Sequence, residues 1–211
     1  MKFSAEMLRL YAVTDRGWLN GKTLAEQVEE AIAGGITCLQ LREKELDRAA
    51  FLAEASALRE LTRRAGIPLI INDDVDICLE SGADGVHVGQ DDLNAREARK
   101  RLGPDRIIGV SARTVAQALD AEAAGADYLG VGDMFGTATK ADAKQTTLEE
   151  LRAICRAVSI PVVAIGGIRE ELVPQLFDSG AAGIAVVSAI FAKPDPAAAA
   201  RRLRVLAEQI H

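Results

Sequence analysis

Short apolar runs and longer amphipathic segments alternate along the whole chain. The runs are three to six residues long and rich in branched side chains, which is the pattern of a buried strand. In the segments between them apolar residues recur every three or four positions, as in a helix with one buried face. The alternation predicts eight strand–helix units, with strands at residues 8–13, 37–41, 69–71, 85–88, 107–110, 128–131, 162–165 and 183–186.

The amphipathic segments carry helix-end signals. Several of them finish in Gly or Gly-Ala, which commonly stand at a helix C-terminus. The stretches AGGITCLQ, SGADGVHV, AGADYLGV and SGAAGIAV repeat one arrangement of helix end, glycine turn and buried strand. The predicted helices lie at residues 24–35, 48–66, 76–83, 95–103, 115–126, 148–159, 170–181 and 196–210.

Eight apolar strands alternating with helices favour an α/β fold of parallel strands covered by helices. Their number favours closure into a single-domain (βα)8 TIM barrel over residues 1–211, with an open doubly wound sheet as the alternative. The first turn, VTDRGWLNGK, does not have the spacing of the glycine-rich dinucleotide fingerprint.

Charge and composition narrow the range of partners. With a net charge of -6 the 211-residue chain is not expected to bind nucleic acid or an anionic membrane, although local basic clusters could still hold anions. Cys38, Cys78 and Cys155 have no paired spacing and are predicted to be buried free thiols in a reducing cytoplasm. Glu6 comes before any long apolar region begins, so the N-terminal residues do not resemble a secretory signal peptide. No apolar run has bilayer-spanning length, and we therefore expect a cytoplasmic location. A homo-oligomer remains possible.

Polar residues gather directly after the predicted strands. In a barrel these positions share one rim, where active sites of this fold lie. The candidates are Gln40, Arg42, Lys44, Asn72, Asp73, Asp74, Gln90, Asp91, Asp92, Ser111 and Arg113.

Two pairs at this rim suggest phosphate chemistry. Arg42 and Lys44 are two residues apart and could converge on one anion, although a solvated charge pair beside the glutamates of LREKE is equally compatible with the spacing. Asp73 and Asp92 follow adjacent strands, and their hard oxygens suit magnesium shared with phosphate oxygens.

His87 and Ser111 have less defined roles. His87 alternates with valines inside a strand, so it could point into the barrel lumen, where we expect a hydrogen-bonded structural role. Ser111 has no evident partner histidine, so no nucleophile–base pair is predicted.

A second anion site is predicted at the ends of the last two strands. Gly166 and Gly167 close the seventh strand and Ser188 follows the eighth, where barrels of this class often bind phosphate through backbone amides. Two tight turns would give the same glycines. Two anion sites imply two phosphorylated ligands or one long ligand.

The stretch GDMFGTATKADAK, residues 132–144, follows the sixth strand without helical periodicity. It is longer than a minimal connector, and long irregular connections are often functional. A solvated surface loop is the other interpretation.

At this point the chain resembles the thiamine-phosphate synthase family nearly from end to end. The segments that carry the likeness, in order, are YAVTD, QLREK, IINDDVDICLESGADGVHVGQDDL, IGVSART, GADYLGVG, TATKADAK, PVVAIGGI and GIAVVSAI. The resemblance implies magnesium-dependent condensation of an aminopyrimidine diphosphate with a thiazole phosphate, by dissociative loss of diphosphate, to give thiamine phosphate.

The resemblance also implies residue roles. Catalysis would fall to Arg42, Lys44, Ser111 and Lys140, and magnesium to Asp73 and Asp92. The pyrimidine diphosphate would bind at Gln40, Leu41, Arg42, Glu43, Lys44, Asn72, Ser111 and Lys140, and the thiazole phosphate at Thr137, Ala138, Thr139, Gly167, Val187 and Ser188.

The sixth loop departs from the family pattern. The family often has prolines where this chain has Asp133 and Gly136, which leaves the thiazole preference open. A related thiazole tautomerase is expected to carry a proton-transferring histidine in this loop, near Asp133. The alternatives are therefore that tautomerase, or a barrel that binds thiamine intermediates without catalysis.

Overall fold

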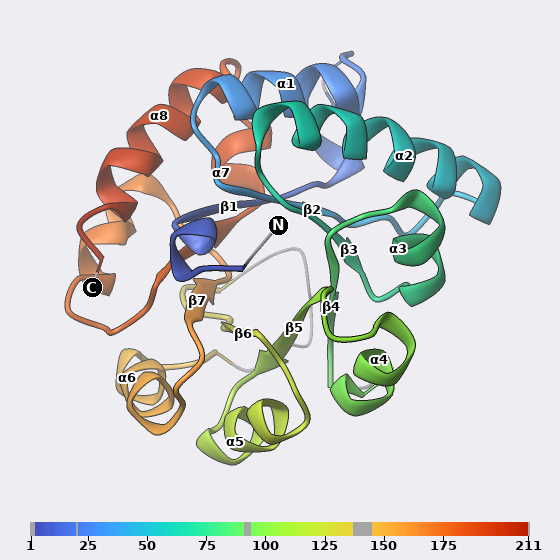
Figure 1. Ribbon diagram of the computed structural model, residues 1–211. Coiled ribbons are helices and arrows are strands. Elements are labelled where there is room, and N and C mark those ends of the chain that lie inside the picture. Colours follow the sequence, from blue (N-terminus) through green and yellow to red (C-terminus); the bar gives the residue numbers. More distant parts are fainter. Residues whose placement is uncertain (1–2, 20, 91–93, 137–144, 211) are drawn as a thin grey trace.

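The computed structural model describes residues 3–19, 21–90, 94–136 and 145–210. Within them parallel strands pair in chain order, and the last strand pairs with the first, so that the sheet closes (Figure 1). The closed barrel is confirmed over the open sheet. Its strands are β1 (Leu10–Val13), β2 (Cys38–Leu41), β3 (Leu69–Asn72), β4 (Gly85–Val88), β5 (Ile107–Ala112), β6 (Tyr128–Val131), β7 (Val162–Ile165) and β8 (Gly183–Val186).

Helices form a ring around the barrel (Figure 1). The α-helices are α1 (Leu24–Ala33), α2 (Arg48–Ala65), α3 (Val75–Ser81), α4 (Ala95–Leu102), α5 (Val115–Ala123), α6 (Leu148–Ala157), α7 (Ser188–Phe191) and α8 (Pro196–Ala207). Short 3-10 helices are η1 (Ala5–Leu8), η2 (Arg16–Trp18) and η3 (Glu170–Leu176).

The first strand and the segment at 170–181 differ from the prediction, and several other boundaries are shifted by one to three residues. The first strand begins at Leu10, because Leu8 belongs to η1. The segment at 170–181, predicted as a helix with the period of the others, forms the 3-10 helix η3 instead. Pro174 lies inside it. A proline has no N–H to donate within an α-helix, and its ring clashes with the preceding turn.

Side-chain caps fix where the helices begin. Thr23 and Thr147 each form a capping box, with Glu26 and Glu150 respectively, ahead of α1 and α6. Single Asp, Asn or Thr side chains cap other helices in the same way, at Asp47, Asp74, Asn94, Thr114 and Asp195. These polar residues between strand and helix therefore have a structural function before any chemical one.

Successive strand residues face two different interiors. One set packs against the helices in the larger apolar cluster, as Leu39, Leu41 and Ile71 do. The alternate set fills the barrel lumen in a second, smaller cluster, as Tyr11, Cys38 and Tyr128 do. This alternation is the period of two that any strand imposes. It decides which side chains can take part in a site inside the barrel.

The N-terminal segment lies across one mouth of the barrel (Figure 1). Leu8 of η1 is buried in the lumen cluster, and Phe3 packs against it. The ring centroids of Phe3 and Tyr128 are 5.9 Å apart. The end of the barrel at which the strands start is therefore covered by apolar side chains.

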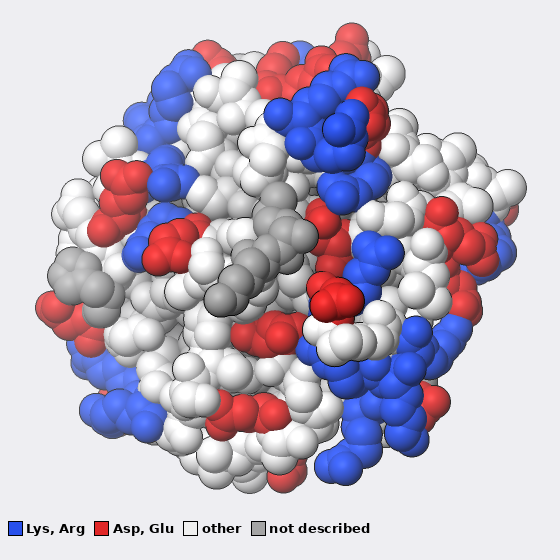
Figure 2. All heavy atoms as spheres, viewed as in Figure 1, with Lys and Arg blue, Asp and Glu red and all other residues white. Residues whose placement is uncertain are grey.

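Acidic and basic side chains are interspersed over the outer helices (Figure 2). Lys and Arg gather most densely over α4, but several of them face carboxylates. Arg99 pairs with Asp127 at 2.7 Å, and Arg101 contacts Asp76. Local pairing reduces the positive field of this patch, which lies on an outer helix and not at the carboxyl ends of the strands. In the described part of the chain no helix is long and apolar enough to span a membrane.

The three cysteines are free, and Cys38 and Cys78 are buried as predicted, while Cys155 is half-buried. Burial raises the pKa of the Cys78 thiol to about 12 and that of Cys155 to about 11. Only about one Cys155 side chain in a thousand would then be a thiolate at pH 8, and the thiolate is the reactive form.

We therefore expect the folded protein to react slowly with an aromatic disulfide reagent at pH 8. The same protein unfolded in guanidinium chloride should release one equivalent of chromophore per cysteine at once. Rapid labelling of all cysteines in the folded protein would contradict the burial.

Candidate active site

Polar side chains meet at the carboxyl ends of the strands. Barrel register pairs Val13 with Gln40, Asn72 with His87 and His87 with Gly109. Gln40 is buried, whereas His87 and Ser111 are partly exposed. These side chains therefore line the upper part of the lumen, where parallel barrels place their active sites.

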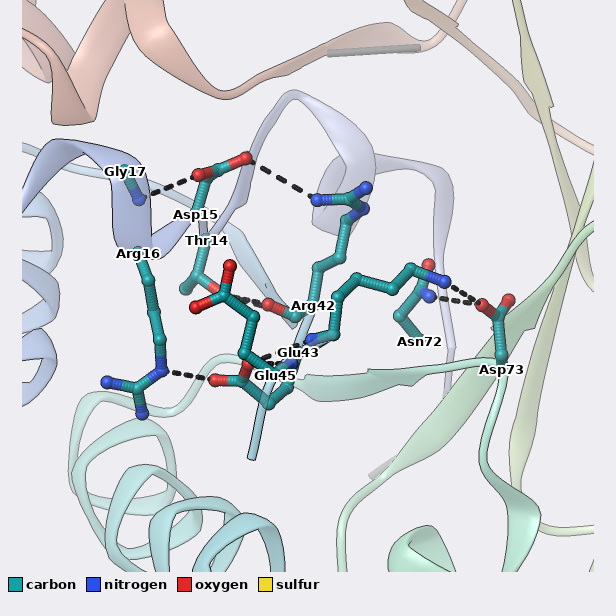
Figure 3. Close-up of polar contacts among 10 residues, drawn as sticks. Thr14, Asp15, Arg16, Gly17, Arg42, Glu43, Glu45, Asn72 and Asp73 are labelled. Carbon is teal, nitrogen blue, oxygen red and sulfur yellow. Dashed lines mark hydrogen bonds and ion pairs between the residues drawn. The ribbon is translucent and has the colours of Figure 1, made fainter. Parts of the chain in front are cut away.

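The loop after β2 is held by the loop after β1 (Figure 3). The Arg42 N–H donates to Thr14 Oγ1 at 3.0 Å, which fixes the backbone. Its guanidinium reaches Asp15, with Nη1 at 3.4 Å from Oδ2. Arg42 is thus oriented by a carboxylate that an incoming anion could replace.

Glu43 braces the same loop and does not face the lumen. It forms an ion pair with Arg16, and its Oε1 accepts the N–H groups of Lys44 and Glu45 (Figure 3). Burial alone would raise the pKa of Glu43, but hydrogen bonds from the Glu45 N–H, Arg16 and the Lys44 N–H lower it overall. In this structure Glu43 shapes the loop, and its predicted contact with the pyrimidine diphosphate stays a prediction. The Leu41 side chain packs in the outer cluster.

Asn72 and Asp73 lie together at the end of β3 (Figure 3), and Lys44 reaches Asp73 from the loop after β2. Lys44 Nζ lies 3.1 Å from Asp73 Oδ2, and the Asn72 side-chain amide donates to the same oxygen at 2.5 Å. Asp73 has a φ of 65°, a left-handed conformation that is uncommon outside glycine. The arrangement brings together three residues predicted from the sequence.

Asp73 and Asp74 are adjacent but have different tasks. Asp74 Oδ1 accepts the N–H of Ile77 at 2.8 Å and caps α3. The Asp73 carboxylate instead faces Lys44 and Asn72. Of the two, Asp73 is the one that offers a hard oxygen ligand to the rim.

A divalent cation at Asp73 would need further ligands. Among the described residues no three His, Cys, Asp or Glu side chains cluster closely enough to hold a metal. Asp92, the other predicted ligand, lies outside the described residues. The oxygen of Asp73 is of the kind that magnesium prefers, and this ion usually completes its coordination with phosphate oxygens and water.

Ser111 does have a histidine partner, contrary to the expectation from the sequence. His87 Nε2 lies 3.0 Å from Ser111 Oγ, and His87 Nδ1 lies 3.0 Å from the Tyr128 hydroxyl. The prediction that His87 points into the lumen and is hydrogen-bonded there is confirmed. The pairing was missed because the two residues are 24 positions apart, although both fall on the lumen side of neighbouring strands.

The loops after β6 and β7 are strapped together by their backbones. Met134 N–H donates to Ile165 O at 3.1 Å, and Phe135 N–H donates to Gly166 O at 3.0 Å. A Cβ on Gly167, whose φ is 64°, would lie 2.2 Å from the Gly136 carbonyl oxygen. Only glycine fits this contact without movement of the backbone.

The two unusual residues of the sixth loop lie against this corner. Asp133 is buried, and a Cβ on Gly166 would be 2.3 Å from its Oδ1. Gly136 has a φ of 76°, which a proline cannot adopt. The glycine thus goes with a loop conformation that the family's common proline would not allow here.

The remaining predicted residues divide into two groups. Val187 directly follows β8 and Ser188 begins α7, and the neighbouring strand β7 leads into the loop that contains Gly166 and Gly167. Outside the described residues lie Thr137, Ala138, Thr139 and Lys140. A cavity of about 350 Å³ adjoins the described part of the sixth loop, lined by Met134, Phe135, Gln145, Thr146, Thr147, Leu148 and Gln175.

Residues 10–190 match the family described as thiamine monophosphate synthase. The chain belongs to this family. It is 52% identical over 194 residues to the thiamine-phosphate synthase of Ruminiclostridium cellulolyticum, covering 92% of each chain. It is 52% identical over 199 residues to that of Chloroflexus aurantiacus, covering 94% of this chain and 92% of the relative.

A solved structure agrees with the sequence relatives. Thiamine phosphate pyrophosphorylase from Pyrococcus furiosus superposes with a TM-score of 0.90 at 39% identity, covering 97% of both chains. A 3-hexulose-6-phosphate synthase, at 20% identity and a TM-score of 0.67, shares the fold only. The match to the thiamine monophosphate synthase family thus covers most of the chain, including the loops after β2 and β3 and those after β7 and β8.

The Gly167 contact can be tested by adding a single carbon. In Gly167→Ala the strain of a positive φ, about 1 kcal/mol, is joined by a backbone overlap that costs about 1–3 kcal/mol more. Gly66→Ala is the matched control, because Gly66 has a φ of 71° but open space around the added carbon. Urea unfolding should show a clearly larger loss for Gly167→Ala, and equal losses would argue against the strap.

Proposed function

We propose that this chain joins an aminopyrimidine diphosphate to a thiazole phosphate, giving thiamine phosphate and diphosphate. The observation that supports the proposal is that two different candidate anion sites lie on one rim. One, after β2 and β3, has the cations Arg42 and Lys44. The other, after β7 and β8, has the glycines Gly166 and Gly167. Two phosphorylated substrates that react with each other need this separation.

The cationic corner suits the diphosphate. Arg42 and Lys44 each face a carboxylate, Asp15 and Asp73, at 3.4 Å and 3.1 Å. A diphosphate can take the place of Asp15 beside Arg42, because phosphate oxygens accept the same guanidinium donors with more charge. Asn72 adds an amide donor beside Lys44. Lys140, assigned by family resemblance, would complete the set.

Asp73 and Asp92 would hold magnesium at this corner. Bound there, the ion supplies positive charge to the diphosphate oxygens. Lys44, which pairs with Asp73 in this structure, would be free to contact the leaving group when Asp73 holds the ion. Arg42 and Lys44 would then stabilise charge that grows as the bond breaks, so they favour the transition state over the ground state.

The reaction needs separation of charge more than proton transfer. The bond between the pyrimidine methylene carbon and the diphosphate oxygen breaks, and its electron pair leaves with diphosphate. The lone pair of the thiazole nitrogen then forms the new C–N bond to that carbon. No general base is required, so the His87–Ser111 pair need only orient substrate.

The glycine corner suits the thiazole phosphate. Backbone N–H groups near Gly166, Gly167 and Ser188, at the ends of β7 and β8, would hold the anion, as barrels of this class often do. The straps from Met134 and Phe135 hold the sixth loop beside this corner. A phosphate held here would place the thiazole ring toward the middle of the rim, facing the pyrimidine carbon.

The central experiment incubates the protein with both substrates and magnesium and follows thiamine phosphate and diphosphate. We expect equimolar formation of the two products. Isomerisation of the thiazole alone would favour the tautomerase, and binding of both substrates without turnover would favour a non-catalytic barrel. Either result would reject the proposal.

Asp73→Asn tests the metal corner, with Asp74→Asn as its matched control. The first change removes a charged ligand, and we expect the magnesium concentration for half-maximal rate to rise on the order of 10- to 100-fold. The second retains an N-cap of α3, because asparagine caps helices as well as aspartate does. An identical magnesium titration for both variants would exclude the proposed role of Asp73.

A further inference from the structure

A chain of buried polar groups crosses the barrel lumen between two residues of the proposed pyrimidine site. The Gln40 side-chain amide donates from Nε2 to the Tyr11 hydroxyl at 2.8 Å. The Tyr11 and Tyr128 hydroxyls are 2.9 Å apart, and Tyr128 contacts His87 at 3.0 Å. His87 then reaches Ser111. The path runs from β2 to β5 through β1, β6 and β4, so it links opposite sides of the rim.

The lumen is built to admit this chain. A Cβ on Gly109 would lie 2.1 Å from the Tyr128 ring and 2.5 Å from His87 Nδ1, so the missing side chain leaves the space in which those two groups meet. A Cβ on Gly130 would lie 2.9 Å from His87 Cε1. Two adjacent strands thus carry glycine on the lumen side where the tyrosine and the histidine need room.

Both tyrosines keep their protons. Tyr11 and Tyr128 are completely enclosed, and burial raises the pKa of each hydroxyl well above its ordinary value. Each hydroxyl therefore has one proton to donate and must find an acceptor, because an unpaired buried donor is costly.

The amide of Gln40 sets the direction in which the chain donates. Tyr11 already accepts from Gln40, so its own proton goes to Tyr128. If Tyr128 donated to Tyr11 instead, the Tyr11 proton would be left with the sulfur of Cys38, a weak acceptor. Tyr128 consequently donates to His87 Nδ1, and His87 carries its proton on Nε2.

The last group in the chain is then fixed as well. His87 Nε2–H donates to Ser111 Oγ, which leaves the Ser111 proton available to a ligand at the rim. Gln40, at the other end, has its amide orientation held by Tyr11. The chain thereby sets one donor and one amide on opposite sides of the same pocket.

We propose that Tyr11 and Tyr128 are positioning residues, which act on the binding of the aminopyrimidine diphosphate without touching it. Tyr11 orients Gln40 directly, and Tyr128 orients Ser111 through His87. The proposal rests on the proposed function, because that function supplies the ligand. Under this proposal, side chains inside the barrel, below the substrate, contribute to the binding of one of the two substrates.

The first test is a direct observation of the His87 tautomer. The chain has two histidines, and in protein with ¹⁵N-labelled histidine the His211→Gln variant assigns the signals. We expect His87 in the unliganded wild type to be protonated on Nε2 only. Tyr128→Phe removes the donor to Nδ1, so the Nδ1-protonated form should become populated. An Nδ1–H tautomer in the wild type, or an unchanged spectrum in the variant, would overturn the proposal.

The second test measures binding of each substrate by calorimetry with magnesium present. Loss of one neutral hydrogen bond corresponds to about a three- to tenfold change in affinity. Tyr11→Phe and Tyr128→Phe should each raise the Kd for the pyrimidine diphosphate by that factor and leave the Kd for the thiazole phosphate within about twofold. Equal weakening of both substrates, or none, would show a structural role only.

A matched control removes one methylene from the lumen without touching the chain. Ile107→Val lies in the same buried cluster at the start of β5, and both affinities and the His87 spectrum should remain as in the wild type. The outcomes also separate the two proposals. A wild type that makes no thiamine phosphate rejects the proposed function, whereas an active wild type with unaltered tyrosine variants rejects the positioning role alone.

Discussion

Closure of the barrel is the constraint on which the rest of the structure depends. When eight parallel strands close, every second residue of each strand enters one shared interior, and that interior must be filled. Its lower part is filled by apolar side chains, capped by Leu8 and Phe3. Towards the carboxyl ends of the strands the interior contains the buried polar groups of Gln40, Tyr11 and Tyr128, which pair inside the protein because burial without a partner is unfavourable. The geometry that makes the barrel stable thus also arranges its polar chemistry.

At the rim, charges are paired in a way that substrate can rearrange. Arg42 and Lys44 are held by Asp15 and Asp73, which keeps the two cations in place before a ligand arrives. Those pairs are partly exposed, so water screens them and an incoming phosphate can replace them at modest cost. Glu43 does not exchange in this way, because its carboxylate is tied to Arg16 and to two backbone N–H groups. The Glu43 carboxylate therefore maintains the shape of the loop, whereas Asp15 and Asp73 are the carboxylates that the proposed ligands would engage or replace.

The strands were predictable from the sequence because a buried parallel strand is a short continuous run of apolar residues. The rim positions of Arg42, Lys44, Asn72 and Asp73 followed from strand ends alone. The contact that sequence reasoning missed depends on which side of its strand each residue faces. The contact between His87 and Ser111 requires knowledge of which face each residue occupies, and the parity of positions within each strand was the signal that could have found it. The 3-10 helix η3 was missed because the spacing of apolar residues at 170–181 was taken as helical although Pro174 lies within it.

The sixth loop shows why family resemblance and local physics have to be read together. Asp133 and Gly136 stood out only by comparison with the family's usual prolines. In the structure Gly136 has a positive φ, and its carbonyl oxygen contacts the site of the missing Gly167 side chain. A proline at 136 would force a negative φ and move that oxygen, so the glycine and the close approach to Gly167 depend on each other. Asp133, packed against Gly166, belongs to the same arrangement. Asp133 and Gly136 therefore both lie against the glycines of the loop after β7, at the corner where the thiazole phosphate is proposed to bind.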